Sequence, residues 1–172
     1  MDEALSDLLD EHRIRRLILI WLDGIDTRDP AKIRAAWAEE METEFIGFPD
    51  MGGGPIAPGR HRTADRAEGL IRMIGQFSMT QHVSTNHLVT IEGDRATCSA
   101  YVLATHHMEV AGREPWSVIG ARYDIEAARL AVGWRLTRLK WTRLWTSGND
   151  ALWAEAGRRM AAEAAAPALV AR

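Results

Sequence analysis

Apolar residues in the first 26 positions recur every three or four residues, which is the spacing of one face of an α-helix. Residues 3–26 therefore predict one long amphipathic helix, whose apolar face widens toward its C-terminal half. The apolar positions are Leu5, Leu8, Leu9, Ile14, Leu17, Ile18, Trp21, Leu22 and Ile25. Asp26 follows this face, where the helix dipole disfavours an acid. Its position indicates a turn or a partner that compensates.

A second helix is predicted to begin at Asp29 and Pro30, because aspartate caps a helix and proline suits the first helical position. This helix covers residues 30–40 and turns Ile33, Ala36 and Trp37 inward. Two further segments follow it along the chain. Residues 42–48 alternate enough to predict a strand, and residues 50–59, rich in glycine and proline, predict a loop of the kind that often covers a pocket mouth.

The second half of the chain changes from helical spacing to alternation. Residues 63–77 predict a helix with Thr63 as its cap. Four strands are then predicted, at residues 83–92, 96–110, 116–126 and 133–145, and the links between them are short enough for hairpins. Residues 149–172 are rich in alanine and predict a helix packed on the outside, a dimer arm or a frayed tail.

Helices followed by a run of antiparallel strands predict an α+β domain with the helices on one face of the sheet. There is no internal repeat and no sign of a second core. We therefore expect one domain over residues 1–148, followed by the C-terminal segment 149–172. A strongly curved sheet with helices across its open side would enclose a hydrophobic cavity.

Composition excludes several classes of partner. The chain has 172 residues and a formal net charge of -3, which gives no reason to expect a nucleic-acid partner. Cys98 is the only cysteine, so the chain cannot form an internal disulfide or a cysteine-based metal site. The acidic N-terminus does not resemble a secretory signal, and no apolar run approaches the roughly 20 residues that span a bilayer. We expect a cytoplasmic protein with no membrane partner.

His82 is the strongest candidate for chemistry, because an imidazole gains and loses a proton near neutral pH and serves as a general base. The alternative is a hydrogen-bonded histidine at a strand end. Asp26 is the candidate that orients it, since a carboxylate bonded to one ring nitrogen fixes the tautomer and raises the basicity of the other. Asp23 is the competing acid, one helical turn away. Asn86 supplies a polar neighbour for a bound molecule.

A pair of histidines, His106 and His107, lies late in the second predicted long strand, and the alternative to a role in the cavity is an edge-exposed pair. Side chains alternate along a strand, so one of the two faces inward, and either could join His82. Trp21 and Trp141 are candidates for the cavity wall, and the indole N–H of Trp21 is a hydrogen-bond donor. A metal site built from histidines and Asp26 is a further alternative, but no close ligand spacing supports it and we predict no metal.

Three segments resemble the SnoaL-like branch of the nuclear transport factor 2-like superfamily. They are GIDTRD at residues 24–29, QHVSTNHLVTIEGDRA at residues 81–96 and GWRLT at residues 133–137, and the resemblance covers about residues 5–146. This group includes scytalone dehydratase, lindane dehydrochlorinase, bile-acid dehydratase, ketosteroid isomerase and SnoaL-type polyketide cyclases. The resemblance implies a cone-shaped curved mixed sheet wrapped by N-terminal helices, and a homodimer or homotrimer.

The resemblance also implies roles for individual residues. Asp26 and His82 match the acid and the base of the dehydratase-type pair, and His107, judged by its spacing from His82, matches the second histidine of scytalone dehydratase; His106 is the alternative. Trp21 stands where relatives carry tyrosine or lysine, which argues against lindane-type dechlorination.

The function expected from these matches is a cofactor-free lyase, similar to a dehydratase, that acts on a small apolar and cyclic substrate. The alternatives are an isomerase or polyketide-cyclase-type enzyme acting on a ketone, and a binding module without turnover.

Overall fold

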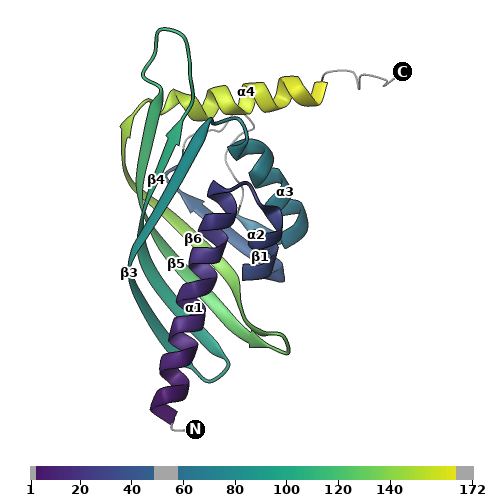
Figure 1. Cartoon of the computed structure of the whole chain (residues 1–172), viewed down its shortest axis with the longest axis vertical. Helices are drawn as coiled ribbons and strands as arrows, with labels where there is room; N and C mark the ends of the chain where they lie inside the picture. Colours follow the sequence, from purple (N-terminus) through teal and green to yellow (C-terminus); the bar gives the residue numbers. More distant parts are fainter. Residues whose placement is uncertain (1–2, 49–57, 166–172) are drawn as a thin grey trace, which may run out of the picture.

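The computed structural model describes residues 3–48 and 58–165. In chain order the elements are α1 (Glu3–Asp26), α2 (Pro30–Ala36), β1 (Trp37–Ile46), β2 (Gly59–Arg62), α3 (Thr63–Ile74), β3 (Met79–Glu92), β4 (Arg95–His107), β5 (Trp116–Leu130), β6 (Gly133–Gly148) and α4 (Ala151–Ala165). Helices α1, α2 and α3 lie on one side of the curved sheet, and α4 crosses one of its ends (Figure 1).

The six strands form one mixed sheet in the order β2-β1-β6-β5-β4-β3. Strands β3 to β6 are antiparallel neighbours, β1 pairs with β6 in parallel, and β2 pairs with β1 in antiparallel fashion. The sheet is strongly curved and stays open, so its concave face is available for the helices (Figure 1). The predicted α+β fold class, with a curved mixed sheet and helices on one side, is confirmed.

Alternation along the strands decides which side chains meet the helices. In β4, Ala100, Val102 and Ala104 are buried, whereas Tyr101 and Leu103 are exposed on the outer face. The small inward residues let the helices approach closely, and apolar area removed from water stabilises the fold by about 25 cal/mol per Å².

The C-terminal half of α1 packs into this concave face, as its wider apolar stripe predicts. Ile14, Ile18 and Leu22 are each less than 4% exposed, whereas Leu5 and Leu8 near the start of α1 are 48% and 62% exposed. The buried half of the helix ends at Asp26, which fixes where that carboxylate meets the sheet.

Local sequence preferences misplaced one boundary. The helix predicted over residues 30–40 ends at Ala36, and the strand predicted at 42–48 begins at Trp37. Pairing of β1 with both β6 and β2 overrides the helical preference of residues 37–40. Thr63 is not a cap either, because its hydroxyl donates to the carbonyl of Ala38 (2.5 Å) and no side chain caps α3.

The segment predicted as a loop at residues 50–59 lies largely outside the described residues. Its last residue, Gly59, begins the short strand β2, which the sequence did not indicate. The four longer strands agree with prediction, although β3 begins at Met79, four residues earlier than expected. Consequently His82 lies within a strand rather than at its start.

Gly148 connects the sheet to the C-terminal helix. Its φ is +83°, and a Cβ at this position would clash with the carbonyl oxygen of Trp116. The next backbone N–H, of Asn149, donates to that same oxygen (2.7 Å). The chain thereby turns sharply into α4, whose residues Leu152 and Trp153 are buried in the core. Of the three alternatives for residues 149–172, residues 151–165 form a helix packed on the sheet.

Within residues 3–48 and 58–165 no helix is long and apolar enough to cross a bilayer.

Candidate active site

The end of α1 is held by its own backbone and by the neighbouring helix. Arg28 has a left-handed backbone conformation (φ +55°), and the N–H of Asp29 donates to the carbonyl of Gly24 (2.8 Å), which completes a C-terminal cap. The guanidinium of Arg28 donates to the carbonyl of Phe77 (2.6 Å), tying this turn to the segment before β3. Asp26 is therefore directed at the start of β3.

Asp26 and His82 meet, as expected. Asp26 Oδ1 accepts from His82 Nδ1 (2.7 Å) and from the hydroxyl of Thr80 (2.9 Å), and Oδ2 accepts from the backbone N–H of His82 (2.7 Å). The His82 side chain is only 3% exposed. The partner that Asp26 requires at a helix C-terminus is thus β3 itself.

The protonation of the pair follows from these contacts. Burial alone would raise the pKa of Asp26, but the hydrogen bonds from the His82 ring and backbone and from Thr80 outweigh it and hold the pKa below its usual value of 3.8. An ionised carboxylate only accepts hydrogen bonds, so His82 Nδ1 carries the proton. The other ring nitrogen, Nε2, is then left with the free electron pair of a base.

The His82 ring faces a largely apolar cavity of about 530 Å³ under the concave side of the sheet. This volume is within the range of small-molecule sites, about 300–1,000 Å³. Its apolar and aromatic wall comes from every layer of the fold, and includes Ile25, Ile33, Met41, Leu70, Ile74, Leu139 and Trp153.

A larger and more open groove of about 1050 Å³ holds none of the candidate residues. Charged side chains line much of it, and Arg138 pairs there with Glu42 (3.2 Å) and Glu126 (3.3 Å). Because these charges compensate one another, the apolar cavity is the better candidate for a site.

His106 shares the cavity with His82. The two rings are perpendicular with centroids 5.6 Å apart, and the His106 ring also packs edge-on against Trp153 (4.4 Å). His106 is fully buried, and neither ring nitrogen has a hydrogen-bond partner among the described residues. Burial, and then the nearby His82, lower the pKa of His106 to about 3, although Asp26 acts in the opposite sense. His106 is therefore a neutral imidazole at neutral pH.

His107 lies outside the cavity, contrary to the preferred assignment. Its Nδ1 lies 2.6 Å from the Ser78 hydroxyl, its Nε2 lies 3.4 Å from Glu109, and its ring packs on Trp116. Strand parity is the physical reason: His106 continues the buried series of β4, and His107 is one residue out of step. The small apolar residues at the even-numbered positions of β4 were a sequence signal that His106, and not His107, faces the core.

Asn86 does not reach the cavity either. It is exposed, with φ +55°, at an irregularity in the pairing of β3 with β4 between Thr85 and Leu88. An expected polar neighbour of the base is therefore a bulge residue, for which asparagine is suited because it tolerates a left-handed conformation. The other two expected wall residues, Trp21 and Trp141, do line the cavity.

The residues of the wall that were missed from sequence include a tyrosine, an arginine and a methionine from three different elements. Tyr123 is 1% exposed and packs on Trp21 (ring centroids 5.3 Å apart), and burial raises the pKa of its hydroxyl, which stays protonated. Arg66 contributes a cation from α3, and Met160 comes from α4. Inward parity in β5 would have indicated Tyr123, whereas the α4 residue depends on a packing that no local pattern encodes.

In residues 3–48 and 58–165 no three His, Cys, Asp or Glu side chains gather closely enough to hold a metal ion. Asp26 uses both oxygens in hydrogen bonds to β3, and His82 uses Nδ1, so the polar side chains nearest the base are committed to one another.

Comparison with solved structures finds the same fold repeatedly. The chain is similar to the Kfla4162 protein from Kribbella flavida, with 28% identity and a TM-score of 0.76 over 88% of this chain and 99% of that one. It is similar in fold to a candidate scytalone dehydratase from Novosphingobium aromaticivorans (18% identity, TM-score 0.68, 85% and 91% covered). It is also similar in fold to the hexachlorocyclohexane dehydrochlorinase LinA-type3 from Novosphingobium barchaimii (19% identity, TM-score 0.70, 86% and 94% covered).

No curated protein sequence matches the chain significantly. A family model, however, matches residues 6–140, which carry most of α1, the strand β3 with His82 and most of the cavity wall. The chain therefore belongs to the SnoaL-like domain family.

Proposed function

We propose that the protein is a cofactor-free lyase that removes a proton from carbon and eliminates water from a small, apolar, cyclic substrate. One observation carries the proposal: a partly buried carboxylate at a helix end orients a buried imidazole ring (2.7 Å) at the wall of an apolar cavity. A pure binding site has no need for a base whose tautomer is fixed in this way.

In the proposed reaction, His82 Nε2 takes a proton from the carbon next to a carbonyl group. The C–H electrons form the new double bond as the C–O bond to a β-hydroxyl group breaks. The departing hydroxide takes up the proton that His82 gained, so that water forms and His82 returns to its neutral form. Asp26 stabilises the imidazolium in between, because its negative charge is close and only partly solvated.

The donor for the substrate oxygens is proposed to be His106 or Tyr123. Both are neutral, both line the cavity, and both ring systems are buried. Trp21 offers only an indole N–H, which forms hydrogen bonds but does not release a proton at neutral pH. A buried neutral donor matched to a developing oxyanion is a strong electrostatic contribution, about 10²–10³-fold per donor in other enzymes.

The test measures the exchange of hydrogen at carbon and does not depend on one chosen product. The protein is incubated in D₂O with a panel of cyclic ketones, including 2-tetralone and 3-hydroxy-1-tetralone, and deuterium wash-in is measured by mass spectrometry. We expect wash-in above the buffer rate for at least one member, with formation of 1-naphthol from the hydroxyketone where water leaves. Wash-in with a shifted double bond and no water loss favours an isomerase or cyclase. Tight binding without wash-in across the panel favours a binding module and contradicts the proposal.

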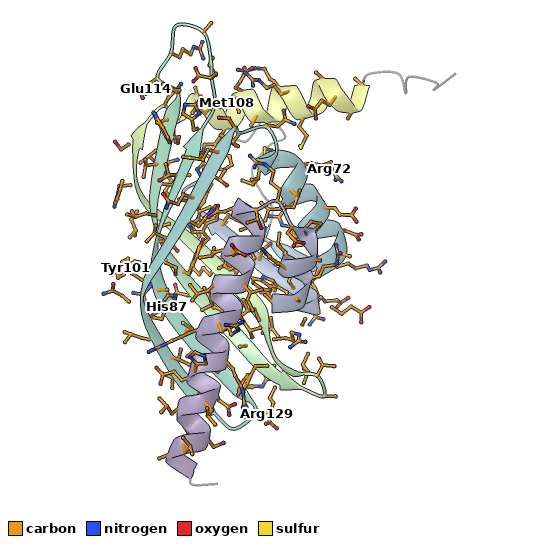
Figure 2. All side chains as sticks on the ribbon, in the orientation of Figure 1. Arg72, His87, Tyr101, Met108, Glu114 and Arg129 are labelled. Atoms are coloured by element: carbon orange, nitrogen blue, oxygen red, sulfur yellow. The ribbon has the colours of Figure 1, made fainter. Side chains whose placement is uncertain are left out.

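We also propose that the chain forms a homodimer or homotrimer through the outer face of its sheet. Val83, Leu103 and Gly120 are consecutive partners across β3, β4 and β5, and Trp145 lies against Gly120 on β6. Three of these side chains are 43–49% exposed, so an apolar row crosses four strands on the face opposite the helices. Tyr101 on the same face points away from the helices (Figure 2).

Light scattering after gel filtration is expected to give two or three times the 19.2 kDa mass of the chain. Leu103→Glu places an unpaired charge in the middle of the row, and should yield the monomer. Val132→Glu is the control, because Val132 is more exposed (69%) but lies in the β5–β6 turn. A wild-type monomer, or an equal effect of both substitutions, would contradict this assignment.

A further inference from the structure

The cavity contains a cation that takes no part in the hydrogen bonds between Asp26 and His82. Arg66, in the first turn of α3, lines the cavity wall, and its guanidinium carbon lies 5.3 Å from the centre of the Phe45 ring. No carboxylate pairs with it among the described residues. By contrast, the guanidinium group of Arg28 donates to a carbonyl and that of Arg13 donates to a carboxylate.

Partial burial makes this arrangement costly for the protein alone. Loss of water lowers the pKa of Arg66, although a guanidinium remains charged at neutral pH. An aromatic face replaces only part of its hydration, about 0.5–2 kcal/mol in measured cation–π pairs. A partly buried cation without an anion among the described residues is therefore left with unused hydrogen-bonding capacity that points to a ligand.

Neighbouring polar atoms are unpartnered as well. Trp141 pairs with Phe45 across β6 and β1, and its buried indole N–H has no acceptor among the described residues. The hydroxyl of Thr43, two residues before Phe45 on the same inner face of β1, is also buried without a partner. All three side chains line the cavity together with Arg66.

These donors and the base occupy different parts of the wall. Thr43 and Trp141 belong to β1 and β6, whereas His82 and His106 belong to β3 and β4, on the other side of β5 in the sheet order. A molecule that spans the cavity would thus meet hydrogen-bond donors at one end and the base at the other, with apolar side chains between.

We infer that the cavity binds a substrate carrying a carboxylate group, which Arg66 receives with Trp141 as a second donor, while the apolar body of the substrate presents its acidic C–H to His82. A carboxylate fits because its two oxygens match the fork of a guanidinium. The inference rests on the proposed function for the reaction, but its recognition step is independent of the base. Arg66 is a specificity-determining residue that recognises the negative charge of the substrate. Asp26 and His82 catalyse the reaction.

The test uses two probes of nearly equal shape, 2-naphthoate and 2-naphthamide, whose dissociation constants are measured by calorimetry. We expect the wild-type protein to bind the carboxylate at least 10-fold more tightly than the amide, about 1.4 kcal/mol. Arg66→Gln should abolish the preference while leaving affinity for the amide within about twofold, because only the charge-assisted contact is lost.

Arg72→Gln is the matched control, since Arg72 is on the same helix, is exposed and points away from the cavity (Figure 2). It should keep the preference. His82→Ala should keep it too, so a failure of the catalytic proposal is distinguishable from a failure of this one. Equal affinities for the two probes in the wild-type protein, or a preference that survives in Arg66→Gln, would overturn the inference.

Discussion

Deuterium wash-in is expected to fall on the order of 10³-fold or more when His82 is replaced by alanine, since a positioned general base contributes about 10²–10⁴-fold and no other side chain at this wall can replace it. His106 is also a neutral imidazole, but its ring stands perpendicular to the ring of His82. No carboxylate among the described residues accepts a hydrogen bond from it. The measurement is the rate of wash-in into the best ketone of the panel, divided by the buffer rate.

Asp26→Asn should lower the rate on a similar scale while preserving the shape of the site. Asparagine can turn its NH₂ group toward His82 Nδ1, which then accepts instead of donating. The proton moves to Nε2, and the nitrogen that faces the substrate ceases to be a base. Protonation of Asp26 should not reduce the wild-type rate at any pH well above 3.8, because the lowered pKa of this carboxyl group keeps it ionised there.

Asp23→Asn is the control for this substitution. Asp23 is one turn earlier on α1, its side chain is 57% exposed, and its partner is Lys32 (2.6 Å) rather than the imidazole. Its removal is expected to leave the rate within about twofold. Full activity in both His82→Ala and Asp26→Asn, or an equal loss in Asp23→Asn, would eliminate the pair as the source of catalysis.

His106→Leu is expected to show opposite effects on activity and stability. Loss of a buried neutral donor should reduce wash-in about 10²-fold. At pH 7.5 the variant should be as stable as the wild type or more so, because two ring nitrogens without partners among the described residues are replaced by apolar surface; unmet buried polar groups cost about 1–3 kcal/mol each. A side chain that favours function over stability would explain why this histidine is buried.

The same variant should change how stability depends on pH. The folded pKa of His106, about 3, lies below the unfolded value of 6.5, so the unfolded chain binds more protons in between. The free energy of unfolding therefore falls as pH drops below 6.5, by about 2 kcal/mol between pH 7.5 and 5 from this residue alone. Urea unfolding of wild type and His106→Leu at both pH values isolates this contribution as a difference.

His107→Leu is the matched control for His106→Leu. His107 sits on the outer side of the strand beside Ser78 and Glu109, and its replacement should leave wash-in unchanged. Activity lost in His107→Leu and retained in His106→Leu would restore the original assignment of the second histidine.

Local patterns determined most of the framework of this protein. The three- and four-residue spacing of α1 located its buried half and its end at Asp26. Alternation located the four long strands and placed His82 immediately before the first of them, whereas β3 in fact begins at Met79 and includes it. These features depend on neighbours within a few residues, through backbone hydrogen bonds and the segregation of apolar side chains, and such information is fully present in a linear sequence.

Only tertiary structure decided what occupies the cavity wall. Pairing with β6 turned Trp37 from helix into strand, the pairing irregularity in β3 moved Asn86 outward, and the register of β4 put His106 rather than His107 inside. Arg66 and α4 join the wall through contacts between segments far apart in the chain. A shift of one residue in register reverses every side chain of a strand, and the energy that fixes the register is spread over the whole sheet and its helices, so no single stretch of sequence contains it.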